Sequence, residues 1–169
     1  MIAINGEAHM LFVIRFSALI LAALTFGLSF AYMLASGPRM AWTPELWIGA
    51  MAGGGQAALI GLVTMIVDPL AVLAAALVAY LVRRRGPVMT MSLAAALLLT
   101  AALAWWFVTV QPMNEAMAAW PRGAVPADFE AVRAQWESGH AVAAVLKALA
   151  FAALAFSVLL ETDGRTVRR

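Results

Sequence analysis

Long apolar runs separated by short polar segments dominate the chain. Residues 16–35 form 20 consecutive positions without a charge, and residues 88–110 form 23. Residues 141–160 contain a single charge, that of Lys147. A helix needs about 20 apolar residues to cross the hydrocarbon core of a bilayer. The pattern therefore predicts a membrane-spanning helix in each of these three regions.

The apolar region at 44–82 is too long for one simple span. Thr43-Pro44-Glu45 is a typical helix start, because Thr caps well, Pro suits the first helical position and Glu suits the first turn. One helix over the whole region would measure about 60 Å, roughly twice the hydrocarbon thickness. Three glycines at 53–55 offer a break. We therefore predict an interfacial or re-entrant helix at 44–53 and a span at 56–82.

Together these segments predict an all-α fold, an integral membrane four-helix bundle formed by one domain, residues 1–169. Pro126-Ala127-Asp128 is a further helix start, so the fourth helix is expected to extend out of the membrane. The expected spans are residues 12–35, 56–82, 88–110 and 141–161, with an outer loop at 111–139.

Composition supports a membrane location and narrows the chemistry. Apolar residues make up 64% of the chain and charged residues 12%, whereas soluble domains have about 45–50% and 25%. The net charge of +2 is spread along the chain, so a nucleic-acid partner is not expected. There is no cysteine, and the two histidines, His9 and His140, are expected on opposite membrane sides. We therefore expect no metal site and no cofactor.

The arginines predict the orientation. Arg83–Arg85 lies between the second and third spans, Arg15 precedes the first, and three arginines follow the fourth. All lie on one side of a four-span protein, and the positive-inside rule makes that side cytoplasmic. The N-terminus lacks the basic start of a cleavable signal. We expect a bacterial inner-membrane protein with both termini in the cytoplasm.

All six tryptophans are expected at or beyond the outer membrane boundary. An aromatic belt at the interface would explain them. Their absence from the other side also suits an outward-facing pocket, and the sequence leaves both interpretations open. The residues are Trp42, Trp47, Trp105, Trp106, Trp120 and Trp136.

Polar residues form a stripe on the predicted fourth helix. Arg133, Glu137, His140 and Lys147 are separated by four, three and seven residues, a spacing that places them on one face. Glu137 lies one turn before His140, where a carboxylate would favour the charged imidazole and fix its tautomer. That arrangement suits a general base, but it equally suits an interfacial salt bridge.

Two ionisable residues are expected at the same depth. Lys147 lies about 21 Å from the inner boundary and Asp68 about 22 Å, counting 1.5 Å per helical residue. Because isolated charges are costly in a bilayer, we predict that Asp68 and Lys147 form a buried pair between the second and fourth spans. The alternative is that Lys147 extends to the surface and Asp68 only caps the helix at Pro69. A pair could be structural, or it could form the floor of a polar cavity.

Three stretches carry a resemblance to a known family. PMNEAMAAWP at 112–121, WESGHAVAAVL at 136–146 and AYMLASGPRMAWTPELWIG at 31–49 resemble elements of the small four-helix membrane proteins grouped with anthrone oxygenases. The resemblance implies a four-span fold and, for a few fungal relatives, oxygenation of anthrones without an obvious cofactor. Relatives commonly carry an Arg after the His of the fourth span. Here alanines occupy 143–144, and the nearest charge is Lys147.

The first functional hypothesis is an outward-facing site for a flat aromatic molecule such as a phenol or quinol, with oxygenase or other oxidoreductase activity. Trp105, Trp106 and Trp136 would supply an apolar slot. His140, tuned by Glu137, would be the base. Lys147 or Arg39 would stabilise the oxyanion, and Asn114 would orient the substrate.

The second hypothesis is a non-catalytic accessory or assembly subunit of a larger membrane complex. A homo-oligomer is a further possible assembly, and one that holds a bound aromatic molecule would favour the first hypothesis. Alanine-rich spans allow close helix approach, which is the usual basis of helix packing in lipid. The same residues would equally pack the bundle against itself. A transporter is less favoured, since no inverted repeat is visible in the sequence.

Overall fold

The computed structural model describes residues 6–52, 56–121 and 123–166, and every regular element within them is helical. The elements are α1 (Gly6–Met40), α2 (Pro44–Met51), α3 (Gln56–Leu81), α4 (Pro87–Trp105), the π-helix η1 (Trp106–Val110), α5 (Gln111–Ala118) and α6 (Phe129–Thr166). Helices α4, η1 and α5 follow one another without a break and form one continuous rod.

Four helical rods are long and apolar enough to cross a membrane. They cover Ala8–Met40, Ala57–Leu81, Pro87–Ala118 and Phe129–Glu161. Large apolar side chains such as Phe12, Leu97 and Val108 are more than half exposed on the outside of the bundle, as expected for surfaces that face lipid. The prediction of an all-α four-span membrane protein is confirmed at this level.

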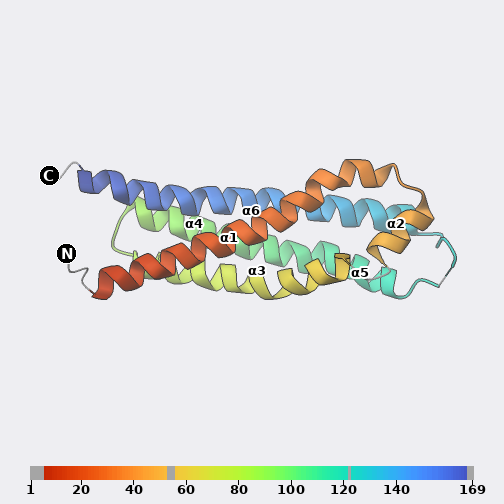
Figure 1. The fold of residues 1–169 in the computed structure, drawn as a ribbon, viewed down its shortest axis with the longest axis horizontal. Coiled ribbons are helices and arrows are strands. Elements are labelled where there is room, and N and C mark those ends of the chain that lie inside the picture. Colours follow the sequence, from red (N-terminus) through yellow and green to blue (C-terminus); the bar gives the residue numbers. More distant parts are fainter. Residues whose placement is uncertain (1–5, 53–55, 122, 167–169) are drawn as a thin grey trace.

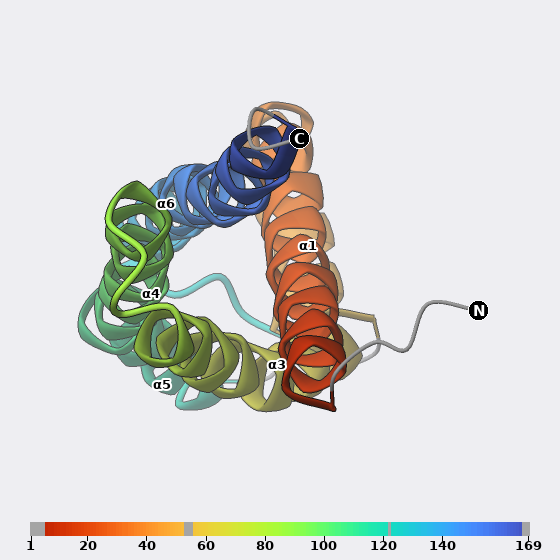
Figure 2. The ribbon, with the colours of Figure 1, turned by 90° about the vertical axis from the view of Figure 1, so that its left-hand side faces the viewer.

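The rods form a ring in the order α1, α3, α4, α6, in which each packs against two neighbours (Figure 2). The start of α1, the end of α6 and the turn between α3 and α4 lie at one end of the bundle, and α2 and α5 lie at the other (Figure 1). Below, these are called the terminal end and the α2 end.

Small side chains form much of the interface between the rods. Ala18 and Ala22 in α1, Ala71 and Ala75 in α3, and Ala95 in α4 are almost fully buried. Because lipid supplies no hydrophobic drive for helices to associate, close backbone approach and van der Waals contact must hold them together. These five alanines are thus used for packing within the bundle.

Two local features differ from the expected boundaries. Helix α1 continues through Pro38 to Met40, beyond the expected end of the span at 35. Within the expected outer loop at 111–139, α5 is a helix that the sequence did not predict, whereas the beginning of α6 matches the expected extension of the fourth helix. Only residues 119–128 connect the two rods there.

Helix α2 begins as the sequence predicts. Thr43 is the N-cap, and its side-chain oxygen accepts a hydrogen bond of 3.4 Å from the backbone N–H of Leu46. Pro44 occupies the first turn, and the helix ends at Met51.

Helix α6 passes very close to η1. A Cβ atom on Gly139 would lie 2.8 Å from Cγ2 of Val110 and 3.2 Å from Cγ2 of Thr109. Only glycine permits this approach without displacement of a neighbour. The contact fixes which turn of α6 packs against η1.

Candidate functional site

A cavity of about 290 Å³ lies inside the ring, toward the α2 end. This volume is near the lower limit of the 300–1,000 Å³ that is common for small-molecule sites. All four rods contribute to its lining. The apolar part of the lining includes Leu28, Met65, Leu103, Trp106, Phe107 and Trp136, and the polar part includes Ser29, Tyr32, Asp68, Asn114, His140 and Lys147.

The floor of the cavity is a buried ion pair. Nζ of Lys147 lies 2.6 Å from Oδ2 of Asp68 and donates a second hydrogen bond of 3.0 Å to Oγ of Ser29. All three residues are less than a tenth exposed. Oδ1 of Asp68 has no hydrogen-bond partner among the described residues. The structure thus brings together the two ionisable residues for which the sequence predicted a common depth, and it leaves one acceptor unfilled.

One wall of the cavity is a group of three rings. The imidazole of His140 stacks on Tyr32, with centroids 5.1 Å apart and planes 22° apart. The indole of Trp136 meets His140 edge-on at 4.3 Å. His140 makes no hydrogen bond to another residue in the described part of the chain, so ring contacts alone hold it in place.

Asn114 has a defined orientation at the other end of the cavity. Nε1 of Trp136 donates a hydrogen bond of 2.9 Å to its Oδ1. Because an indole N–H can only donate, this bond identifies the amide oxygen and leaves the amide NH₂ free of partners among the described residues. Asn114 therefore offers donors, whereas the floor offers an acceptor.

A second ion pair lies behind the ring wall. Glu137 accepts two hydrogen bonds from Arg39, at 2.8 and 2.6 Å, and one of 3.0 Å from Nε1 of Trp47. Arg39 also donates to the backbone oxygen of Tyr32 at 2.8 Å. Bidentate pairs of this kind are strong and fix orientation. This network joins α1, α2 and α6.

The Arg39–Glu137 pair bears on the roles that were expected for these two residues. Both carboxylate oxygens of Glu137 accept hydrogen bonds from Arg39, Trp47 shares one of them, and no hydrogen bond between Glu137 and His140 is present among the described residues. Arg39 is 5% exposed and is not part of the cavity lining, so it is not placed to contact an oxyanion there. Both residues support the wall from behind.

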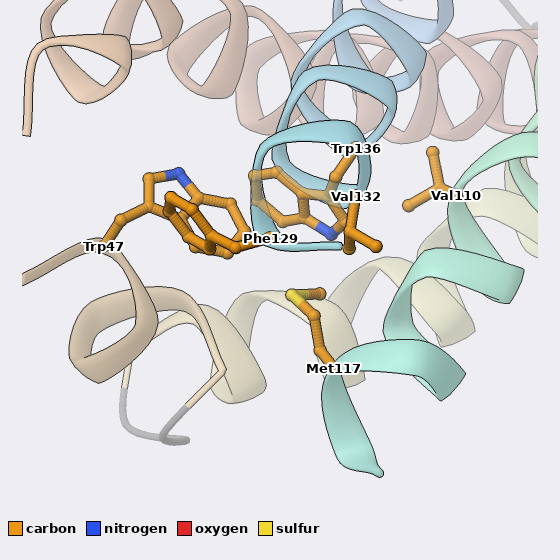
Figure 3. Packing of buried hydrophobic residues seen from close by; sticks show 6 residues of the cluster. All are labelled: Trp47, Val110, Met117, Phe129, Val132 and Trp136. Atoms are coloured by element: carbon orange, nitrogen blue, oxygen red, sulfur yellow. The ribbon is translucent and has the colours of Figure 1, made fainter. Parts of the chain in front are cut away.

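The tryptophans divide between the cavity and its surroundings. Trp106 and Trp136 line the cavity. Trp105 does not; it is 38% exposed and donates a hydrogen bond of 3.1 Å to the backbone oxygen of Gly139. Trp47 is fully buried in an apolar cluster with Val110, Met117, Phe129, Val132 and Trp136, which closes the α2 end (Figure 3). Figure 3 shows the rings of Trp47, Phe129 and Trp136 gathered close together in this cluster.

The sequence reasoning missed a polar stripe on α1. Thr25, Ser29, Tyr32 and Arg39 follow one another at steps of four, three and seven residues and so share one face. This stripe runs antiparallel to that of α6. Arg39 contacts Glu137, Tyr32 contacts His140, and Ser29 contacts Lys147. The matching spacing of the two stripes is visible in the sequence, and it indicates that the first and fourth spans pack against each other through these faces.

The cavity shows no set of side chains that could bind a metal ion among the described residues. Within the described residues, no three His, Asp or Glu side chains gather closely enough to hold a metal ion. Comparison of the chain with protein-family models, with curated proteins and with solved structures found no match. What the site can do must therefore be argued from its own geometry.

Proposed function

We propose that this small integral membrane protein binds a flat, uncharged aromatic molecule of the phenol or quinol type in the cavity between its four rods. The observation that carries the proposal is the combination of aromatic walls with an unfilled carboxylate oxygen at the floor. A buried acceptor without a donor is costly, and a ligand hydroxyl would satisfy it. Because the χ2 angle of Asp is broad, a small rotation of the Asp68 carboxylate would present Oδ1 to the ligand.

The charges around the cavity favour a neutral ligand. Asp68 is paired with Lys147, and Arg39 is paired with Glu137. A charged ligand would remain uncompensated in a medium of low dielectric constant, and this would cost several kcal/mol, about the effective penalty for one buried ion. A phenol or quinol enters as a neutral molecule and can still be ionised inside the cavity.

For the chemistry, we propose a cofactor-independent oxygenase or oxidoreductase reaction. His140 takes the phenolic proton, and Lys147 stabilises the resulting anion. With a quinol, dioxygen then takes up two electrons from the anion and the two hydroxyl protons, so that the quinol becomes a quinone and dioxygen becomes hydrogen peroxide. Asn114 orients the substrate through its NH₂ group, Trp106 and Trp136 cover the faces of its rings, and Arg39 and Glu137 hold the wall that carries His140.

We extend the proposal to family and location. The resemblance to anthrone-oxygenase-like proteins rests partly on WESGH and on the Pro-x-Asn element, and these stretches supply three cavity residues, Asn114, Trp136 and His140. The arginines of the turn at 83–85 lie at the terminal end, which supports a cytoplasmic location for both termini. A bacterial inner membrane is the corresponding expectation.

The alternative of an accessory subunit has no specific support from packing. In α4 and α6, Ala95, Ala96, Ala143, Ala144 and Ala150 are buried inside the ring, whereas Ala101, Ala104 and Ala152 are exposed on its outside. A solidly packed bundle would have favoured a subunit, whereas this bundle contains a cavity.

The test is ligand binding to the protein in lipid nanodiscs, measured as quenching of tryptophan fluorescence by a naphthol. Trp106→Phe removes a reporter inside the cavity, and Trp105→Phe is the matched control outside it. We expect Trp106→Phe to lose part of the quenching, because Trp136 remains in the cavity lining, and Trp105→Phe to keep it. Asp68→Leu/Lys147→Met, which removes the floor as a pair, should weaken naphthol binding about tenfold, because a hydrogen bond to a charged group is worth roughly 1.5–3 kcal/mol. No saturable quenching of the wild type, or equal loss from both tryptophan variants, would refute the proposed site.

A further inference from the structure

The cavity between the four rods is open along one side. Gly61, Met65 and Asp68 follow one another on α3 at steps of four and three residues, so they share one face, and all three line the cavity. Asp68 at the floor is 8% exposed, whereas Met65 is 66% exposed and Gly61 is also exposed. A Cβ atom on Gly61 would meet nothing within 4 Å. The face of α3 that is covered at the floor is therefore uncovered one turn nearer the α2 end.

The opposite side of this opening is formed by η1. Phe107 lines the cavity and is 58% exposed. Helix α4 packs on both α3 and α6, whereas η1 and α5, which continue the same rod, pack on α6. The opening lies between Met65 and Phe107, where this rod leaves α3, and it is called the mouth below.

The mouth lies within the apolar part of both rods. Met65 is eight residues from the start of the span Ala57–Leu81, or about 12 Å along the helix, and Phe107 is 11 residues from the end of the span Pro87–Ala118, or about 16 Å. Next to Phe107, Val108 is exposed on the outside of the bundle, as expected for contact with lipid. The mouth therefore opens toward hydrocarbon and not toward water.

The side chains around the mouth are apolar. Ile60 and Met65 of α3, and Leu103 and Phe107 of the opposite rod, line the cavity on these two sides. The hydroxyl of Thr64 donates a hydrogen bond of 3.0 Å to the backbone oxygen of Ile60, so it is used within its own helix. Among the described lining residues of α3, α4 and η1, the only charge is the carboxylate at the floor. A molecule that passes the mouth thus meets hydrocarbon surfaces until its head reaches the floor.

The dimensions indicate how a molecule would lie. The cavity of about 290 Å³ is near the lower limit for small-molecule sites, and the cluster around Trp47 closes the α2 end. Gly61 lies seven residues from Asp68, or about 10 Å along α3. A two-ring molecule whose hydroxyl reaches Asp68 would therefore place its far end beside Gly61. A long substituent at that end has to leave through the mouth.

We propose that the ligand is a phenol or quinol that carries a hydrocarbon chain and is dissolved in the membrane. Its ring system occupies the cavity, and its chain passes between Met65 and Phe107 into the bilayer. This inference rests on the proposed function, because it assigns the ring and its hydroxyl to that same site. It adds a route of entry, laterally from lipid, and a substrate class, since only a molecule that partitions into the bilayer reaches the mouth.

The experiment compares three naphthols by quenching of tryptophan fluorescence in lipid nanodiscs. 2-Naphthol has no further substituent, 6-hexyl-2-naphthol has a chain opposite the hydroxyl, and 6-hydroxynaphthalene-2-sulfonate has a charge at that position and stays in water. Protein-free nanodiscs give the concentrations of the first two in the lipid. At equal concentration in the lipid, the wild type should bind these two within about threefold of each other, because the chain exchanges one hydrocarbon environment for another. The sulfonate should show no saturable quenching.

Gly61→Leu tests the mouth itself. It should weaken binding of the hexyl derivative about tenfold, because added methylenes in an occupied space are costly, and keep 2-naphthol binding within about threefold. Gly27→Leu is the matched control, because its added Cβ atom also meets nothing within 4 Å but Gly27 does not line the cavity. Met65→Trp narrows the mouth one turn nearer the floor and should show the same selectivity as Gly61→Leu.

The outcomes separate this inference from the proposed function. A wild type that binds 2-naphthol but not its hexyl derivative would overturn the inference and leave the proposed function intact, whereas a wild type that binds neither would refute both. Saturable binding of the sulfonate would assign entry to the aqueous side instead. Equal effects of Gly61→Leu and Gly27→Leu, or an equal loss of both naphthols in Gly61→Leu, would also overturn the path assigned to the chain.

Discussion

Lys147 in α6 and Asp68 in α3 face each other inside the bundle, with Nζ and Oδ2 2.6 Å apart. Neither residue reaches the lipid-facing surface, because both are less than a tenth exposed. The pair joins two rods that are not neighbours in the ring, and Ser29 adds a third rod to the contact. A charge pair at this depth determines both the stability of the bundle and the polarity of the cavity floor.

Breaking the pair from one side should be costly. Lys147→Met leaves the Asp68 carboxylate buried without its cation, and we expect a loss of about 3–5 kcal/mol in the free energy of unfolding. The double variant Asp68→Leu/Lys147→Met removes both charges, so it should recover most of that loss. Unfolding in mixed detergent micelles measures both values. A double variant as unstable as the single one would show that the two residues are not coupled.

The Arg39–Glu137 pair should behave differently from an exposed pair on the same helix. Glu137→Gln leaves the Arg39 guanidinium buried without a counter-charge and weakens the bond from Trp47. We expect a loss of about 3 kcal/mol or more, with a shift in tryptophan emission as the α2 end loosens.

The control for this change is Glu130→Gln. The side chain of Glu130 is 69% exposed and pairs with Arg133 at 2.6 Å. Its loss should cost less than the loss of Glu137, because Glu130 lies in water and the buried Arg133 keeps a hydrogen bond to the backbone oxygen of Trp42. Similar losses from the two glutamine variants would contradict the structural role assigned to Glu137.

Gly139 should tolerate no side chain. Gly139→Ala places a methyl group 2.8 Å from Cγ2 of Val110, so we expect a destabilisation of about 1–3 kcal/mol. Val110→Ala in the same chain should relieve part of it. Gly27→Ala is the matched control, because nothing lies within 4 Å of its added Cβ atom. That change should be neutral or stabilising by up to about 1 kcal/mol. Thermal unfolding in detergent would distinguish the two glycines.

His140 offers a test of the proposed chemistry that is separate from binding. His140→Phe keeps a flat ring between Tyr32 and Trp136 but removes both nitrogens. We expect naphthol binding within about threefold of the wild type, and loss of oxygen uptake with an oxidisable phenol or anthrone, typically by 10²–10⁴-fold for a lost general base. Undiminished oxygen uptake by His140→Phe would remove the base assignment and leave the binding proposal intact.

The sequence predicted those features of the fold that follow from a single physical rule. Apolar runs of bilayer length with few charges predicted the four spans, because lipid tolerates few other patterns. The rise of a helix placed Asp68 and Lys147 at one depth, and the structure has them in contact. Whether they act on a ligand remains a prediction.

The partners of other residues could not be predicted from one helix at a time. Glu137 was expected beside His140 from spacing alone, yet it contacts Arg39. To foresee that contact, one would have to know that α1 stays helical beyond Pro38 and lies antiparallel to α6. Trp105 and Trp106 are adjacent, so about 100° of helical rotation separates them, and the sequence alone does not tell which of the two lines the cavity.

The wide turn at η1 has a consequence for how related chains should be aligned. A π-helical turn accommodates one residue more than an α-helical turn, and each residue of an α-helix advances the chain by about 100°. A chain one residue shorter within 106–110 could follow an ordinary α-helical path and still present its equivalent of Asn114 toward the bundle interior. A gap of one residue at this point would therefore keep the same residues of α5 facing the bundle interior. An alignment that forbids such a gap would shift every position of α5 by one residue.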